Sequence, residues 1–130
     1  MQEIIIGTTG KAETKATEDK LASSVGSGSL RVFATPEMIA LMEQAACNAL
    51  ADKLEGDETT VGTELNVKHV SATPEGMNVC AEAEVIAVNG REFTFTVKAY
   101  DDAGLIGEGE HKRFLVFGDK FIAKANTKKA

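Results

Sequence analysis

Tryptophan is absent from the 130-residue chain, which has one tyrosine, two prolines and two cysteines. Nucleic-acid platforms that stack bases need exposed aromatic rings, so this scarcity argues against them. A net charge of -6 also argues against a general nucleic-acid binder, because such proteins carry a basic face. The cysteines form no CxxC pair, and isolated cysteines of this kind are usually reduced, buried side chains.

Long apolar runs are missing too, since no segment approaches the ~18 residues of a membrane-spanning helix. The first residues, MQEIIIGTTG, have no basic residue before a short apolar run, unlike a secretory signal. We therefore predict a cytoplasmic protein that has no membrane segment. Phosphate-binding, dinucleotide, serine-hydrolase and zinc motifs are also missing, so we expect no metal and no bound cofactor.

Length and composition predict one domain over residues 1–130, with residues 1–10 and 120–130 as flexible tails. Charge is unevenly distributed, because residues 111–130 hold six Lys or Arg and only one acidic residue. This basic end is either a solvated tail or a docking patch for an anionic ligand such as the phosphates of a nucleotide-like carrier.

Residues 35–54 are predicted as one buried helix. Thr35 suits the N-cap, Pro36 suits the first helical position, and Gly56 follows the end of the segment. Apolar residues occupy nearly the whole circumference, which is typical of a helix covered on most sides.

Most of the remaining chain has the alternation and turn signals of β-strands. The predicted strands are residues 59–70, 77–88, 91–100 and 105–117, with residues 11–17 as a polar edge strand. Asn89-Gly90 indicates a tight hairpin, whereas residues 22–29 read as a loop. One helix that is apolar all round needs a sheet that curls around it, so we predict an α+β fold with a curved antiparallel sheet. Its edge strands favour pairing in a dimer.

Two polar residues stand out on apolar faces. Glu43 has no cation at helical spacing and is either a functional carboxylate or a residue at the open edge of the sheet. His69 ends the alternating row that contains Val61, Thr63 and Leu65, and is either a half-buried structural histidine or an acid–base group. Both would face the same interior, so the two side chains could meet.

Three further residues allow a structural and a functional interpretation. Thr35 is a helix cap or a hydroxyl near an anion-binding helix start, and Gly62 is a bend or an accessible backbone N–H. Arg113 shares one strand face with Gly107, Gly109 and His111, and forms a surface ion pair or grips an anionic substrate group. For His111 we favour a structural role.

Three stretches resemble the hotdog-fold acyl-CoA thioesterases, most closely the group that contains fluoroacetyl-CoA thioesterase: FATPEMIALMEQAACNALADKL, TTVGTELNVKHVSATPEGMNVCAEAEV and GLIGEGEHKRFLV. The likeness runs from about Phe33 to the tail. Its motifs are Phe-Ala-Thr before the helix, Leu-Met-Glu within it, Val-Gly-Thr, His before Ala-Thr-Pro, and Gly-x-Gly-x-His-x-Arg.

The resemblance implies hydrolysis of an acyl-CoA thioester by a catalytic Thr35, Glu43 and His69 set. It also implies that Gly62 contacts the acyl carbonyl and that Arg113 contributes to substrate binding. Relatives of this kind are homodimers with sites near the subunit interface, and a tetramer is conceivable. One departure concerns the segment before Phe33, where the fluoroacetyl enzyme has pocket-covering phenylalanines and this chain has none. We therefore expect a small acyl group other than fluoroacetyl. The alternative is a non-catalytic acyl-CoA or small-ligand binding protein on the same fold.

Overall fold

A computed structural model describes residues 1–129; Ala130, the end of the predicted C-terminal tail, lies outside the described residues. The strands are β1 (Thr9–Lys15), β2 (Glu58–His69), β3 (Asn78–Asn89), β4 (Glu92–Asp101) and β5 (Gly104–Phe117). The α-helices are α1 (Ala22–Val25), α2 (Thr35–Leu50) and α3 (Gly118–Asn126), and the 3-10 turns are η1 (Glu18–Lys20), η2 (Ala51–Lys53) and η3 (Thr127–Lys129).

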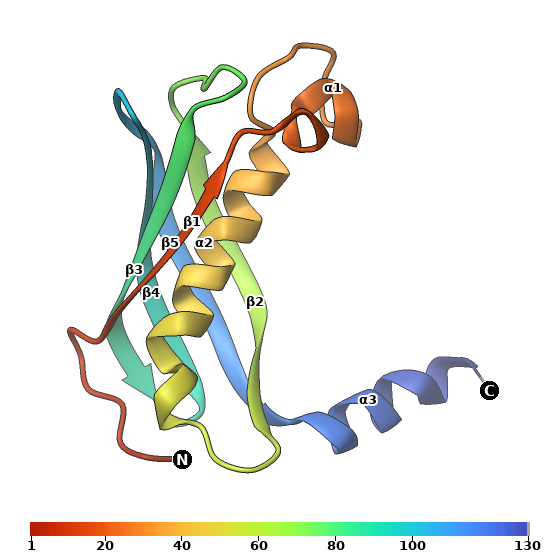
Figure 1. Cartoon of the computed structure of the whole chain (residues 1–130). Helices are drawn as coiled ribbons and strands as arrows, with labels where there is room; N and C mark the ends of the chain where they lie inside the picture. Colours follow the sequence, from red (N-terminus) through yellow and green to blue (C-terminus); the bar gives the residue numbers. More distant parts are fainter. Residues whose placement is uncertain (130) are drawn as a thin grey trace.

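All five strands form one antiparallel sheet in the order β1-β3-β4-β5-β2. The sheet curves around α2, which runs along its concave face (Figure 1). This arrangement confirms the predicted α+β fold of a curved antiparallel sheet around one long helix. The strands β1 and β2 form the two edges of the sheet, so one side of β2 has no neighbouring strand among residues 1–129.

The helix α2 supplies a third of the buried residues of the core. Its buried positions are Met38, Leu41, Met42, Ala45, Ala46, Ala49 and Leu50. They pack against the inward sides of β3 and β4, where Val85, Phe93 and Phe95 are fully buried. The alternation predicted for these two strands is therefore confirmed.

Small residues let α2 and β1 approach closely. A Cβ atom on Gly10 would overlap the backbone of Ala45 and Ala49, so only glycine fits this position. This contact closes one side of the sheet over the helix, while the side near β2 stays more open.

The predicted cap of α2 was wrong. Ala34 is the N-cap residue, without a side-chain hydrogen bond, and Thr35 is already helical. The Thr35 hydroxyl forms a hydrogen bond with His69 and does not cap the helix. The helix ends at Leu50, and η2 continues it with one tighter turn.

A β-bulge in β2 changes which side chains face α2. The pairing of β2 with β5 shifts register between Gly62 and Glu64. Before the bulge, Thr60 is buried and Gly62 lies against the side chain of Glu43. A bulge adds one residue and inverts the alternation, so the prediction of Val61 and Thr63 on the same inward face as His69 was wrong.

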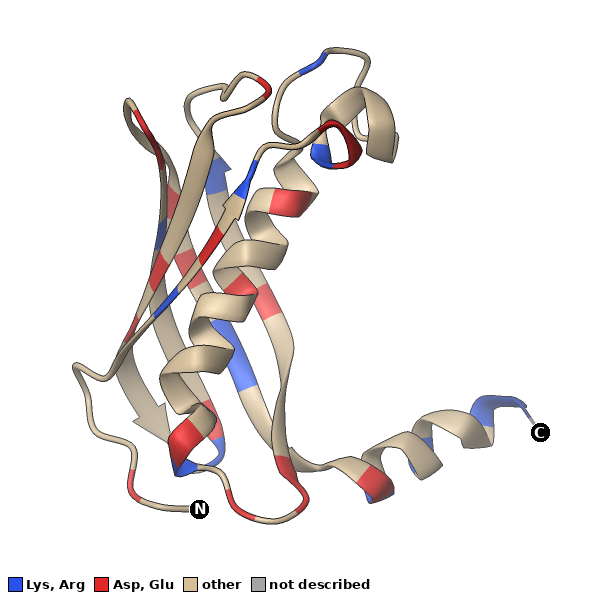
Figure 2. Cartoon of the chain, viewed as in Figure 1, with Lys and Arg blue, Asp and Glu red and all other residues tan. Residues whose placement is uncertain are grey.

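Two segments are helical where the sequence did not predict a helix. Residues 22–25 form the short helix α1 within the expected loop, and the expected polar tail forms α3 and η3. Four of the six basic residues of the basic end lie on α3 and η3, which extend from the body past the β2 side of the sheet, while Lys112 and Arg113 lie on β5 (Figure 2). Among residues 1–129, no helix has the length and apolarity needed to cross a membrane.

Candidate active site

Thr35 and His69 form a hydrogen-bonded pair where α2 begins and β2 ends. The Thr35 Oγ1 atom lies 2.8 Å from His69 Nδ1. The sequence reasoning assigned both residues to one site, and the fold brings them together from positions 34 residues apart. We call Thr35 and His69 the pocket pair.

The second ring nitrogen of His69 is the notable atom of the pocket pair. His69 Nε2 is buried and has no hydrogen-bond partner in the part of the chain that the structure describes. Burial lowers the pKa of His69 below its ordinary value, which keeps the ring neutral near pH 7. A neutral imidazole with one uncommitted nitrogen can accept or deliver a proton.

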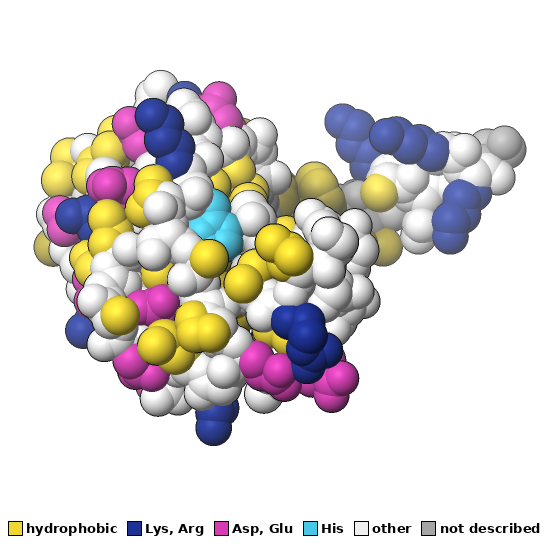
Figure 3. All heavy atoms as spheres, turned by 90° about the horizontal axis from the view of Figure 1, so that it is seen from above, with side chains coloured by type: hydrophobic (Ala, Val, Ile, Leu, Met, Phe, Trp, Pro, Cys, Tyr) yellow, Lys and Arg dark blue, Asp and Glu magenta, His cyan; other side chains and the backbone are white. Residues whose placement is uncertain are grey.

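A pocket of about 300 Å³ opens beside the pocket pair. It is lined by Ala22, Ser27, Val32, Phe33, Thr35, His69, Val70, Ser71 and Ala72. Figure 3 shows a histidine at this end of the molecule, with hydrophobic and other side chains beside it. The pocket is therefore small and lined by both apolar and polar side chains, among them the pocket pair.

Glu43 has a cationic partner, although it comes from the sheet and not from the helix. Arg113 Nη1 lies 3.3 Å from Glu43 Oε2. The Arg113 side chain is 7% exposed and that of Glu43 is 37% exposed. Arg113 thus forms an ion pair, but its guanidinium is buried and not at the surface, whereas the Glu43 side chain is partly exposed.

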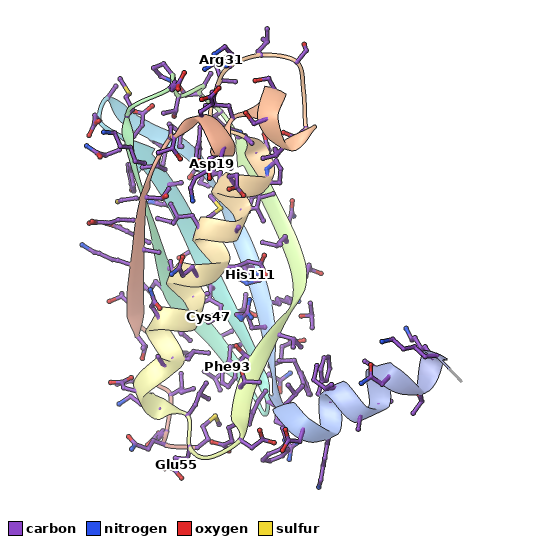
Figure 4. All side chains as sticks on the ribbon, turned by 45° about the vertical axis from the view of Figure 1, so that its right-hand side comes forward. Asp19, Arg31, Cys47, Glu55, Phe93 and His111 are labelled. Carbon is purple, nitrogen blue, oxygen red and sulfur yellow. The ribbon has the colours of Figure 1, made fainter. Side chains whose placement is uncertain are left out.

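The Arg113 guanidinium is fixed by neighbours on β2 and β5. Its Nε donates to Thr60 Oγ1 at 2.9 Å and its Nη2 donates to the Thr60 carbonyl at 3.0 Å. Its Nη1 also lies 3.1 Å from His111 Nε2. Figure 4 shows His111 on β5, between the sheet and α2.

Gly62 completes this second grouping. A Cβ atom at Gly62 would lie 2.7 Å from Glu43 Oε2 and 3.2 Å from His111 Cε1. The β2 backbone therefore lies close to the carboxylate, and any side chain at position 62 would displace the Glu43 carboxylate from its present place. We call Glu43, Thr60, Gly62, His111 and Arg113 the arginine cluster.

The two groupings are separate within one chain. Thr35 and Glu43 are eight residues apart on α2, which corresponds to roughly 12 Å along the axis. No hydrogen bond joins Glu43 to His69 among the described residues, so the expected meeting of these two side chains does not occur in one subunit. The described residues also contain no group of His, Cys, Asp and Glu able to hold a metal ion.

Thr60 is a site residue that the sequence reasoning missed. It lies two residues before Gly62 and uses both its hydroxyl and its carbonyl to hold Arg113. The bulge sets this inward position, and alternation through the predicted strand places Thr60 on the wrong face.

Comparison with known proteins identifies the family. The sequence profile described as FlK, fluoroacetyl-CoA-specific thioesterase, matches residues 16–119. This range contains both the pocket pair and the arginine cluster. The chain belongs to the FlK thioesterase family. It is therefore an enzyme of the thioesterase class on the hotdog fold, which favours catalysis over the non-catalytic binding alternative.

Individual relatives agree with this assignment to the FlK family. The fluoroacetyl-CoA thioesterase of Streptantibioticus cattleyicolor is 42% identical over 97 residues, which cover 75% of this chain and 70% of that protein. A crystal structure of an FlK variant in complex with acetyl-CoA superposes with a TM-score of 0.92 at 32% identity, covering 98% of this chain and all of the other. A thioesterase superfamily member from Thermus thermophilus has a TM-score of 0.90 at 27% identity and covers 99% of this chain and 96% of that one.

Proposed function

We propose that this FlK-family thioesterase hydrolyses the acyl-CoA thioester of a small acyl group to the free acid and CoA. The observation that carries the proposal is the buried, unpartnered Nε2 atom of His69, a residue that lines a pocket of about 300 Å³. A buried polar atom without a partner is unfavourable unless a ligand or reactant group engages it. The acetyl-CoA complex of an FlK variant supports the same class of substrate.

His69 carries the proton transfers in this proposal. The Thr35 hydroxyl can donate to or accept from Nδ1, so it orients the ring in either tautomer and leaves Nε2 free. Neutral His69 takes up a proton that originates from the hydrolytic water, and the resulting imidazolium gives this proton to the CoA thiolate. General acid–base catalysis of this kind typically contributes 10²–10⁴-fold to the rate.

Glu43 supplies the carboxylate, by one of two routes. In the first route it attacks the thioester carbonyl carbon, the C–S bond breaks, CoA leaves as a thiolate, and water hydrolyses the mixed anhydride. In the second route Glu43, and not His69, removes the proton from the attacking water. The C–S bond of the resulting tetrahedral adduct breaks, and the proton passes through His69 to the CoA thiolate. Single turnover in ¹⁸O-labelled water separates the routes, because label enters the Glu43 carboxylate only in the first.

The separation of the two groupings favours a site shared between subunits. Thr35, which is hydrogen-bonded to His69, lies roughly 12 Å from Glu43 along α2. One thioester carbon therefore cannot contact Glu43 and His69 of the same subunit. The β2 edge is unpaired within the chain, and antiparallel pairing of two β2 edges would bring Glu43 of the partner subunit toward the pocket pair. We therefore propose a homodimer, in which Gly62 and Arg113 act beside the Glu43 of their own subunit. Further pairing into a tetramer stays a prediction.

The pocket lining bears on the acyl group. Ser27 lies in the segment SVGSGSLR before Phe33, and it lines the pocket beside His69. No aromatic side chain from this segment covers the pocket, which supports a small acyl group other than fluoroacetyl. The free cysteines Cys47 and Cys80 support the predicted cytoplasmic location, where thiols stay reduced.

The direct test is release of free thiol from a panel of acyl-CoA esters at neutral pH, including acetyl, fluoroacetyl, branched, aromatic and long-chain esters. We expect release from a narrow set of small esters, with fluoroacetyl-CoA not preferred. The His69→Ala variant should lose this activity while it keeps its melting temperature. A folded wild-type protein that releases no thiol from any ester would contradict the proposal.

A further inference from the structure

His111 is a fully buried histidine that the proposed reaction does not use directly. It lies on β5 two residues before Arg113, and both of its ring nitrogens have partners. His69, by contrast, leaves one nitrogen free. The two contacts of His111 therefore suit a residue that holds neighbouring groups in place.

The two contacts of His111 assign its tautomer. Nδ1 lies 2.8 Å from the carbonyl oxygen of Glu64, and a carbonyl can only accept, so Nδ1 carries the hydrogen. Nε2 lies 3.1 Å from Arg113 Nη1, which can only donate, so Nε2 must be unprotonated. Burial, opposed in part by the Glu64 hydrogen bond, lowers the pKa of His111 and keeps this neutral form.

The Nε2 atom of His111 orients the guanidinium group of Arg113. The Nη1 group carries two hydrogens, and its two neighbours are His111 Nε2 and Glu43 Oε2. With Thr60 holding Nε and Nη2, four of the five guanidinium donors have partners. Without an acceptor at the Nε2 position, a buried donor would lose its partner and the guanidinium could turn away from Glu43.

Nδ1 of His111 holds the other side of the same cluster. The Glu64 carbonyl that it binds ends the bulge after Gly62, and the His111 ring also contacts the Gly62 position. The ring itself is stacked on Phe95 of β4, with centroids 6.0 Å apart. One side chain thus links the bulge, the guanidinium and, through it, the carboxylate.

We infer that His111 is a positioning residue, which fixes Arg113 and the Gly62–Glu64 bulge so that Glu43 presents its carboxylate in one orientation. The charged groups facing it are Arg113 on β5 and, across the guanidinium, Glu43 on α2. The inference rests on the proposed function only for its turnover measurement.

Three substitutions separate the two contacts. His111→Gln can keep an acceptor at the Nε2 position, His111→Asn can keep a donor at the Nδ1 position, and His111→Phe keeps only the ring. We expect kcat for a small acyl-CoA to fall by about 10- to 100-fold in the Asn and Phe variants, because small misplacements of reacting groups have effects of this size. The Gln variant should stay within about threefold of wild type, and KM should change little in all three.

The pH profile and a stability control exclude a merely structural effect. The acid limb of kcat, which we assign to His69, should keep its position in all three variants because His111 does not exchange protons with substrate. Val79→Ala, a core truncation on β3 whose strand neighbours are Thr14 and Asp101, should lower the melting temperature and leave kcat unchanged. Equal kcat in wild type and a folded His111→Phe variant would overturn the inference, as would a shift of the acid limb.

A measurement without substrate keeps the inference testable if the proposed function fails. In wild type, the Nε–H of Arg113 should be protected from hydrogen exchange in ¹H–¹⁵N spectra. Protection should fall at least tenfold in the Asn and Phe variants and persist in the Gln variant. The same protection in all four proteins would overturn the positioning role, whether or not the enzyme hydrolyses acyl-CoA. Absence of thiol release with the expected protection pattern would overturn only the proposed function.

Discussion

The pocket pair and the arginine cluster lie on the same helix and are built in opposite ways. Thr35 and His69 share one hydrogen bond beside an open pocket, and Nε2 of His69 lacks a partner among residues 1–129. In the arginine cluster, both nitrogens of His111 and four donors of Arg113 have partners. The difference fits the proposed roles, in which the pocket pair exchanges protons and the arginine cluster holds the Glu43 carboxylate in one orientation.

The largest effect should follow from removing the negative charge of Glu43 in the arginine cluster. Glu43→Gln keeps an oxygen for Arg113 and the size of the side chain, so the fold should be retained. We expect kcat to fall by about 10²–10⁴-fold, since the carboxylate that acts as nucleophile or base is lost. Glu37→Gln on the first turn of α2 is the matched control and should keep wild-type turnover. A Glu43→Gln enzyme with near wild-type kcat would remove Glu43 from the mechanism.

A smaller loss should follow from displacing the carboxylate without changing its charge. In Gly62→Ala, the added methyl group would meet Glu43 Oε2 at 2.7 Å and force the carboxylate to move. We expect a loss of about 100-fold in kcat, as is typical of displacements near 1 Å. Gly28→Ala is the control, because its methyl group makes only an ordinary contact with Ala22 at 3.4 Å. Unchanged kinetics in Gly62→Ala would show that the position of this carboxylate is not critical.

On the pocket side, loss of the Thr35 hydroxyl should have a milder effect. Thr35→Val keeps the shape of the side chain and leaves His69 Nδ1 without its partner. We expect a drop of about tenfold in kcat, the equivalent of one neutral hydrogen bond that orients the ring. Thr35→Ser should keep most activity. Because Thr35 is not the N-cap, neither variant should lower the melting temperature, and a marked loss of stability would contradict that placement.

The smallest expected effect is a decrease of folding stability as the pH falls. The pKa values of His69 and His111 are both lowered, chiefly by burial. Below the ordinary histidine pKa of about 6.5, the unfolded chain binds protons that the folded chain does not, so stability falls as pH decreases. Urea midpoints at pH 7.5 and 5.5 should show this decline, and it should be smaller in His69→Gln. The same midpoint difference in His69→Gln would mean that His69 does not contribute.

The helix and most strands could be predicted from sequence because local patterns determine them. The apolar circumference of α2 and the alternation in β3 and β4 follow from which side chains must be buried. The candidate site residues Glu43 and His69 were singled out because they interrupt apolar faces, and Thr35 because its hydroxyl lies at the start of the helix. The family resemblance pointed to the same three positions.

Interactions between distant strands could not be predicted in the same way. The bulge after Gly62 depends on how β2 pairs with β5, and it decides that Thr60 faces inward while Thr63 does not. The ion pair of Glu43 with Arg113 joins residues 70 positions apart, so helical spacing alone could not reveal the cation. The prediction that Thr35 caps the helix was wrong for the same reason, because its hydrogen-bond partner, His69, lies on another element.

The central claim is that the pocket pair of one subunit works with the arginine cluster of the other. Mixing the inactive variants His69→Ala and Glu43→Gln tests it most directly, because a mixed dimer would contain one site with both native groups. We expect thiol release to return to about a quarter of the wild-type value, since half of the dimers are mixed and each has one intact site. If the mixture stays as inactive as its components while mixed dimers are present, the two groupings do not act across the interface.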